Sequence, residues 1–190
     1  QVKSLAIAKG MPLTELEVAN TKIHDFSFIG DMKQLRKLNV NGTQFKEPNL
    51  LSQLPLEELY MRSTGVNDIS ALKGLNLRGL DISRTNVKDF SILESFSLYY
   101  LDVSVTKFDS LALLEKMDSL TSLWISDTGV SDLSPIKELK LKAIGIDLPR
   151  QMLVQHPHLM NEIQSVVVVS ELTLVGARDV IRILSWLKSN

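Results

Sequence analysis

Apolar residues recur at fixed places along most of this chain of 190 residues. Residues 120–140 show the unit most clearly. Apolar side chains stand at its first, fourth and sixth places, a Thr at the ninth, and apolar side chains again at the eleventh, fourteenth, seventeenth and twentieth. Successive copies begin 21 or 22 residues apart. Their first residues are Leu13, Leu35, Leu56, Leu77, Leu98, Leu120 and Leu141, with a degenerate copy at Ile163. A fixed period in this range predicts a solenoid of stacked repeats rather than a globule with a central core.

Each repeat is predicted to hold two elements. From the fourth to the seventh place, apolar and other residues alternate, as they do in a short strand with one buried face. Strands one repeat apart must stack in parallel, because the segment between them returns to the same edge of the sheet. That segment is short and begins with residues that favour helix N-caps, so a single turn or a short 3₁₀ helix is predicted. The predicted N-caps are Ser27, Asn49, Ser70, Ser91 and Ser134.

The whole chain, 1–190, is predicted to form one domain. Residues 1–12 fit either the end of a preceding repeat or an N-terminal capping helix, and residues 13–162 hold seven repeats. The seventh repeat departs from the pattern around Pro149, where regular stacking is expected to loosen. Residues 163–190 are interpreted as a degenerate last strand and a capping helix that covers the open apolar end. A partner-binding amphipathic helix is the alternative for that last segment.

Two polar columns run through the repeats. The ninth place is predicted to lie inside the turn that leaves each strand, where a hydroxyl can satisfy backbone groups. A flat ice- or crystal-binding array is the alternative for this column. The thirteenth place holds acids that are expected to cap the return turns, with calcium ligation as the alternative. The ninth-place residues are Thr21, Thr43, Thr64, Thr85, Thr106 and Thr128. The thirteenth-place acids are Asp25, Glu47, Asp68, Asp89 and Asp132.

The repeat, L-x-x-L-x-I-x-x-T-x-V-x-D-L-S-x-L-x-x-L, resembles the short bacterial leucine-rich repeats of the internalin-like type over about residues 13–160. Thr stands where that family more often has Asn. The resemblance implies an α/β leucine-rich-repeat solenoid with a parallel, concave sheet of about eight short strands. Short helical or 3₁₀ turns would cover its convex side, and a helix would cap its C-terminal end. The chain also resembles repeat arrays attached to some bacterial serine/threonine kinases, which would imply a larger parent protein, but it contains no kinase motif.

Composition removes several classes of function. The formal net charge of −1 gives no general attraction to nucleic acid or to an anionic membrane. The chain contains no cysteine, which excludes disulfides, thiolate metal sites and thiol nucleophiles. No apolar run is long enough to span a bilayer, so membrane insertion is not expected. His156 and His158 are interpreted as loop histidines, because the sequence offers no third histidine nearby. No metal, cofactor or catalytic residue is predicted, and the compartment stays open.

The exposed face of the predicted sheet is the candidate binding surface. Its side chains come from the third, fifth, seventh and eighth places, and they include aromatic residues and Arg, which are common in binding hot spots. We therefore expect a non-catalytic module, acting as a monomer, that binds a protein or peptide through side chains pointing to solvent. The alternative is a structural spacer or surface-display segment without a specific ligand. The candidate binding residues are Tyr60, Arg62, Asp81, Arg84, Tyr100, Asp102, Trp124 and Asp127.

Overall fold

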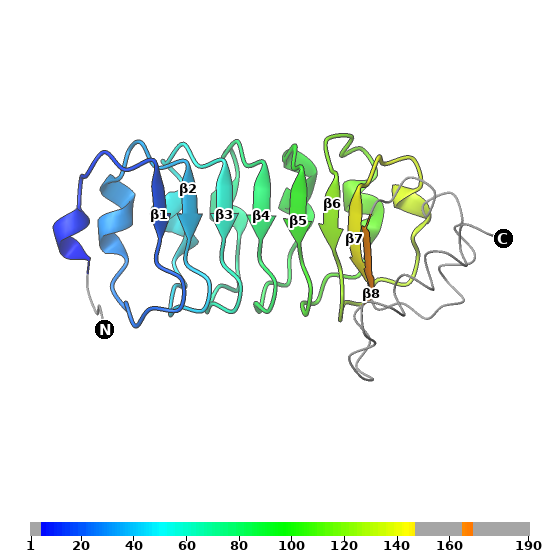
Figure 1. The fold of residues 1–190 in the computed structure, drawn as a ribbon, viewed down its shortest axis with the longest axis horizontal. Helices are drawn as coiled ribbons and strands as arrows, with labels where there is room; N and C mark the ends of the chain where they lie inside the picture. The colour runs from blue at the N-terminus through cyan, green and yellow to red at the C-terminus, as the bar shows by residue number, and fades with distance from the viewer. Residues whose placement is uncertain (1–4, 147–164, 169–190) are drawn as a thin grey trace.

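The strands of all repeats form one parallel sheet in a computed structural model, which describes residues 5–146 and 165–168. The sheet has eight strands in the order β1 to β8, and each strand pairs with the next along the long axis of the molecule (Figure 1). This confirms the predicted parallel sheet of about eight short strands. The strands are β1 (Glu15–Glu17), β2 (Lys37–Asn39), β3 (Glu58–Tyr60), β4 (Gly79–Asp81), β5 (Tyr100–Asp102), β6 (Ser122–Trp124), β7 (Ala143–Ile146) and β8 (Ser165–Val168).

The return segments are short 3₁₀ helices, as predicted. Each has three to five residues, and the helices from η1 to η4 and from η5 to η7 contact their neighbours in sequence. They are η1 (Ala6–Ala8), η2 (Ser27–Asp31), η3 (Pro48–Leu51), η4 (Ser70–Leu72), η5 (Ser91–Ser95), η6 (Leu111–Leu114) and η7 (Ser134–Ile136). We call the side of the sheet that does not pack on these helices the open face.

The caps of these helices differ from the prediction. Ser27, Ser70, Ser91 and Ser134 are the first residues of their helices, and Asn49 lies inside η3. The capping group is the acid two residues earlier, whose Oδ1 accepts a hydrogen bond from the Ser N–H. The four distances are 2.9 Å for Asp25, 2.8 Å for Asp68, 2.9 Å for Asp89 and 2.9 Å for Asp132. The predicted Ser caps were therefore wrong, and the capping function of the acids is confirmed for these four.

Two exceptions show what happens when the acid changes. Glu47 precedes η3, but its longer side chain makes no capping hydrogen bond. Ser110 precedes η6, and its Oγ accepts from the N–H of Ala112 at 3.4 Å. At Asp89 the Ser91 N–H is the main cause of a pKa held below the usual value. Across the described residues, no three acids or histidines gather closely enough to hold a metal ion.

The core is a stack of leucines, one layer per repeat. Fourth-place leucines such as Leu59, Leu80 and Leu101 have no exposed surface, and they pair in register across β3, β4 and β5. The remaining apolar columns surround them, and two edge-to-face phenylalanine pairs, each with ring centroids 5.2 Å apart, add to the packing between neighbouring repeats. In the core, each strand therefore packs on the strands of the neighbouring repeats, as expected for a solenoid.

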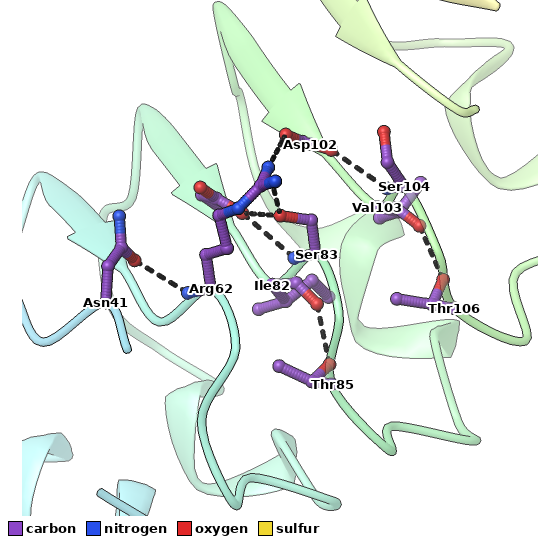
Figure 2. A network of polar contacts seen from close by, with 10 residues as sticks. Asn41, Arg62, Ile82, Ser83, Thr85, Asp102, Val103, Ser104 and Thr106 are labelled. Carbon is purple, nitrogen blue, oxygen red and sulfur yellow. Dashed lines mark hydrogen bonds and ion pairs between the residues drawn. The ribbon is translucent and has the colours of Figure 1, made fainter. Parts of the chain in front are cut away.

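The ninth-place threonines close the turn after each strand. In all six of them, Oγ1 donates to the carbonyl oxygen three residues earlier at 2.6–2.8 Å. Figure 2 shows two of these bonds, from Thr85 to Ile82 and from Thr106 to Val103. The hydroxyls are directed into the turns, which confirms the structural interpretation of this column and leaves no flat hydroxyl array.

The residue before each Thr has a left-handed backbone, which the sequence did not reveal. Such a conformation is routine only for Gly and is tolerated by Asn and Asp. Val105 is the most strained of these residues, because a β-branched side chain rarely adopts a positive φ angle. The φ angles are 57° at Asn20, 64° at Gly42, 53° at Ser63, 53° at Arg84, 56° at Val105 and 52° at Asp127.

Several sequence predictions lie outside the described residues. They are the irregular seventh repeat around Pro149, the two histidines at 156 and 158, and the helix proposed for the C-terminal segment. The division of the chain into terminal caps and seven repeats stays a prediction.

The burial of the fourth place predicts the effect of removing its side chain. Leu80→Ala should lower the free energy of unfolding by about 2 to 5 kcal/mol, because it empties a buried leucine site. Arg78 lies two residues away and its side chain is exposed, so Arg78→Ala should change the free energy of unfolding by less than about 0.5 kcal/mol. Denaturant unfolding measures both. A neutral Leu80→Ala would contradict the register of β4.

The strained turn predicts a stabilising substitution. Val105→Asn should raise the free energy of unfolding by about 0.5 to 1 kcal/mol, because Asn adopts the left-handed conformation with less strain. The reverse exchange at the same turn of the first repeat, Asn20→Val, should lower it by a similar amount. Thermal unfolding of both variants checks the pair, and equal shifts in one direction would refute the explanation.

Candidate binding site on the open face

The fifth place of each repeat forms a straight row across the open face. The register pairs Tyr60 with Asp81, Asp81 with Asp102, and Asp102 with Trp124. Neighbouring members are therefore one strand spacing apart, about 4.8 Å. The register therefore places these four residues side by side across β3 to β6.

The two acids of the row do not point freely to solvent, which corrects the prediction. Asp81 is only 5% exposed and Asp102 only 6%. Each carboxylate turns back toward its own backbone and accepts from the N–H two residues later, at 2.9 Å from Ser83 and 2.8 Å from Ser104. Neighbouring large side chains at Tyr60 and Trp124 flank the pair in the row. The sequence pattern predicts on which face of a strand a residue lies, but it does not show how far the neighbouring side chains extend above that face.

Burial makes Asp81 the most perturbed acid of the row. The pKa of Asp81 is raised to about 6, mainly by loss of solvent and also by the charge of Asp102, while hydrogen bonds from Ser83 and the charge of Arg62 act in the opposite direction. Ser83 Oγ donates to Asp81 Oδ1 at 2.6 Å. Asp81 is therefore well hydrogen-bonded but poorly neutralised.

Arg62 extends across β4 to reach this acidic pair. Its Nη1 donates to Ser83 Oγ at 3.4 Å and lies 3.9 Å from Asp102 Oδ2 (Figure 2). Its backbone N–H donates to Asn41 Oδ1 at 2.6 Å, which fixes where the side chain starts. The guanidinium approaches Asp102, but the Arg62 side chain remains 44% exposed. Arg62 is therefore a partly exposed cation next to the two acids rather than a member of a buried ion pair.

A tyrosine cluster borders the row at the start of the strands. Glu58 accepts from two hydroxyls, at 2.8 Å from Tyr60 to Oε2 and 2.8 Å from Tyr99 to Oε1. The rings of Tyr60 and Tyr100 lie 6.3 Å apart across β4, where the intervening residue is Gly79. Burial is the main reason that the pKa values of all three tyrosine hydroxyls lie above the usual value.

Sequence reasoning did not place Tyr99 in this cluster. Tyr99 stands at the second place, outside the predicted face, yet its hydroxyl reaches Glu58 two strands away. Gly79 was the available signal, because a glycine inside a strand often marks a close approach of other groups. A Cβ there would lie 3.5 Å from the Tyr99 hydroxyl and 3.4 Å from Glu58 Cγ.

Trp124 ends the row and changes the local hydrogen bonding. Its indole lies over Gly145 of β7, where a Cβ would come within 2.0 Å of the ring. In the earlier repeats the fifth-place acids Asp81 and Asp102 accept from the seventh-place Ser, whereas Trp124 offers no such acceptor. Ser126 Oγ is accordingly buried without a hydrogen-bond partner among the described residues. The tryptophan thus replaces a turn-stabilising acid.

Arg84 and Asp127 were grouped with the row because they stand at the eighth place of their repeats, but the structure puts them elsewhere. Both occupy the left-handed position, with φ angles of 53° and 52°, in the turn that follows the strand. They are exposed at the border of the open face rather than on the strands. The row itself is formed by Tyr60, Asp81, Asp102 and Trp124, with Arg62 and Tyr100 beside it.

The perturbed acid predicts a pH-dependent stability difference. The folded pKa of Asp81 lies above the ordinary value of 3.8, so ionisation costs the native state stability as pH rises through about 6. Asp81→Asn should therefore be more stable than the native protein at pH 7 to 8, by on the order of 1 to 3 kcal/mol. The difference should shrink toward zero below about pH 4.

Denaturant unfolding at a series of pH values measures this difference. Asn39 accepts from the N–H of Asn41 at 3.0 Å in the same column, so Asn fits the position. Asp89→Asn is the control of opposite sign, because its folded pKa is lowered, and it should be the less stable protein at neutral pH. A lower stability of Asp81→Asn at pH 8 would contradict the assignment.

The chain is similar in fold to several solved structures. No family model matches it, and no curated protein matches it. Internalin C2 of Listeria monocytogenes superimposes with a TM-score of 0.67 at 23% identity, over 83% of this chain and 71% of that one. InlF of the same organism gives 0.65 at 21% identity, over 97% of this chain and 62% of that one.

A third match is the functional domain of InlJ from Listeria monocytogenes, which includes a cysteine ladder. It gives a TM-score of 0.52 at 22% identity, over 86% of this chain and 41% of that one. The chain thus spans less than two thirds of the InlF and InlJ structures. At these identities the likeness concerns the fold, and in its fold this chain is a leucine-rich-repeat solenoid of the internalin type.

Proposed function

We propose that this chain is a non-catalytic module that binds a protein or peptide on its open face. The observation that carries the proposal is the row on β3 to β6, where half-buried Tyr60, Tyr100 and Trp124 border the acids Asp81 and Asp102. Aromatic side chains held at a surface are typical of the residues that dominate binding energy. The row is long and shallow, which suits an extended peptide or a protein loop.

The local cost of the row supports this function. Asp81 is an acid with a raised pKa at a position where Asn would serve the same hydrogen bond. Trp124 leaves the hydroxyl of Ser126 buried and unpaired among the described residues. Gly79 has no side chain where the Tyr60 and Tyr99 hydroxyls approach, and Gly145 has none where the Trp124 ring lies. Features that disfavour folding and gather in one area are expected at functional surfaces.

Recognition fits this geometry better than catalysis. Members of the row are separated by one strand spacing each and do not converge on a point where a reacting atom could lie. Asp81 and Asp102 direct their carboxylates at their own turns. We further propose that the module belongs to a larger bacterial protein, because the InlF and InlJ chains that share the fold are longer than the matched part.

The test is a selection of random peptides on the immobilised protein, followed by affinity measurements. Tyr100→Ala and Trp124→Ala should each weaken the selected peptides by more than about 1 kcal/mol, or about fivefold, because each removes a large contact from the row. Lys116→Ala, an exposed change beyond the end of η6, should leave the affinity unchanged. Peptides that bind both aromatic variants as tightly as the native protein would favour a structural spacer instead.

A further inference from the structure

Charge is distributed unevenly over the open face. The third, fifth and seventh places of the repeats from β1 to β6 carry five acids and two basic residues, although the whole chain has a formal charge of only −1. The acids are Glu15, Glu17, Glu58, Asp81 and Asp102. The basic residues are Lys37 and Arg62. The face on which we place the binding site is therefore acidic, and it complements a basic partner.

The two basic residues of the face are already shared among the acids. Lys37 Nζ lies 3.9 Å from Glu17 Oε1 and 3.9 Å from Glu58 Oε2. Arg62 Nη1 lies 3.9 Å from Asp102 Oδ2. All three distances are at the long end of ion pairing, so the acids keep capacity for another cation. The position of Arg62 also shows that a guanidinium can lie within 3.9 Å of the Asp102 carboxylate (Figure 2).

Two tyrosine rings border the acidic pair, with their centroids 6.3 Å apart. Tyr60 neighbours Asp81 in the row, and Tyr100 lies two places before Asp102 on β5. A ring face attracts a cation electrostatically, and its apolar surface can hold the methylene chain of Lys or Arg. The pKa of Asp81 is raised mainly by burial and also by the charge of Asp102, and the charge of Arg62 offsets this only in part. Asp102, Arg62 and Tyr100 are the other charged or titratable groups that act on it.

Resting on the proposed function, we propose that the partner is a basic protein segment. A Lys or Arg side chain of that segment lies against the rings of Tyr60 and Tyr100 and pairs with the carboxylates of Asp81 and Asp102. The apolar neighbours of this basic residue contact Trp124, one strand beyond Asp102. Arg62 moves aside or shares the acids, because its own contacts to them are long.

Two consequences follow for affinity. Binding should weaken as ionic strength increases, since the opposed charges at the rim are screened. It should also strengthen as pH rises through about 6, because the cation pairs with ionised Asp81, and the incoming charge lowers the pKa of that acid. An uncharged partner held by the aromatic rings alone would show neither effect.

The experiment compares peptides selected from a random library on the native protein. Basic peptides should dominate, and the double variant Asp81→Asn with Asp102→Asn should bind them about tenfold more weakly. The control is Glu94→Gln with Glu115→Gln, which removes two exposed charges on the helix side and should leave affinity unchanged. Unfolding curves of the double Asn variant check that it is folded. We expect a folded protein because Asn39 already occupies the same place in the second repeat.

The outcomes separate the two proposals. Basic peptides that lose affinity in the double Asn variant, with the expected dependence on salt and pH, support the basic partner. Neutral or acidic peptides that depend on Trp124 but not on the two acids would overturn this inference and leave the proposed binding function intact. Selected peptides that depend on neither the acids nor the aromatic residues would overturn both.

Discussion

One turn recurs in the first six repeats. Three positions after the end of the strand stands a left-handed residue, and the Thr that follows it donates its hydroxyl to the carbonyl three residues earlier. The turn limits each strand to a few residues and fixes its register against the next. As a result, residues at the same place of successive repeats lie side by side across the sheet. The row on the open face follows from this arrangement, because Tyr60, Asp81, Asp102 and Trp124 line up only if the turns between them have the same shape.

The periodicity of the sequence was enough to predict the parallel sheet, the short 3₁₀ returns and the buried leucines, because these depend on spacing alone. Contacts between side chains of different height were not predictable in this way. The burial of Asp81 depends on tall neighbours in adjacent repeats, and the reach of Tyr99 depends on a missing side chain at Gly79. The caps were assigned to Ser rather than to the preceding Asp because both residue types favour that position, and spacing does not separate them.

Stability and recognition make opposite demands on the open face. A repeat optimised for folding alone would carry Asn or Asp at the fifth place and Ser at the seventh, paired as in Asp81 and Ser83. Trp124 breaks that pairing for Ser126, and the Asp81–Asp102 neighbours repel each other. These departures are confined to β4, β5 and β6, while the core beneath them stays regular. The solenoid tolerates them because the core of each repeat is completed by the neighbouring repeats.

The direction of the hydrogen-bond ladder has a mechanical consequence. Strands lie across the long axis of the molecule, so the bonds between them run along it (Figure 1). A tension applied to the two ends would load these bonds in series and open the terminal repeat first, before any central one. Each detached repeat of 21 or 22 residues would release about 70 Å of extended chain. The solenoid would then act as a stepwise extensible tether, whose surface disappears one strand at a time under load.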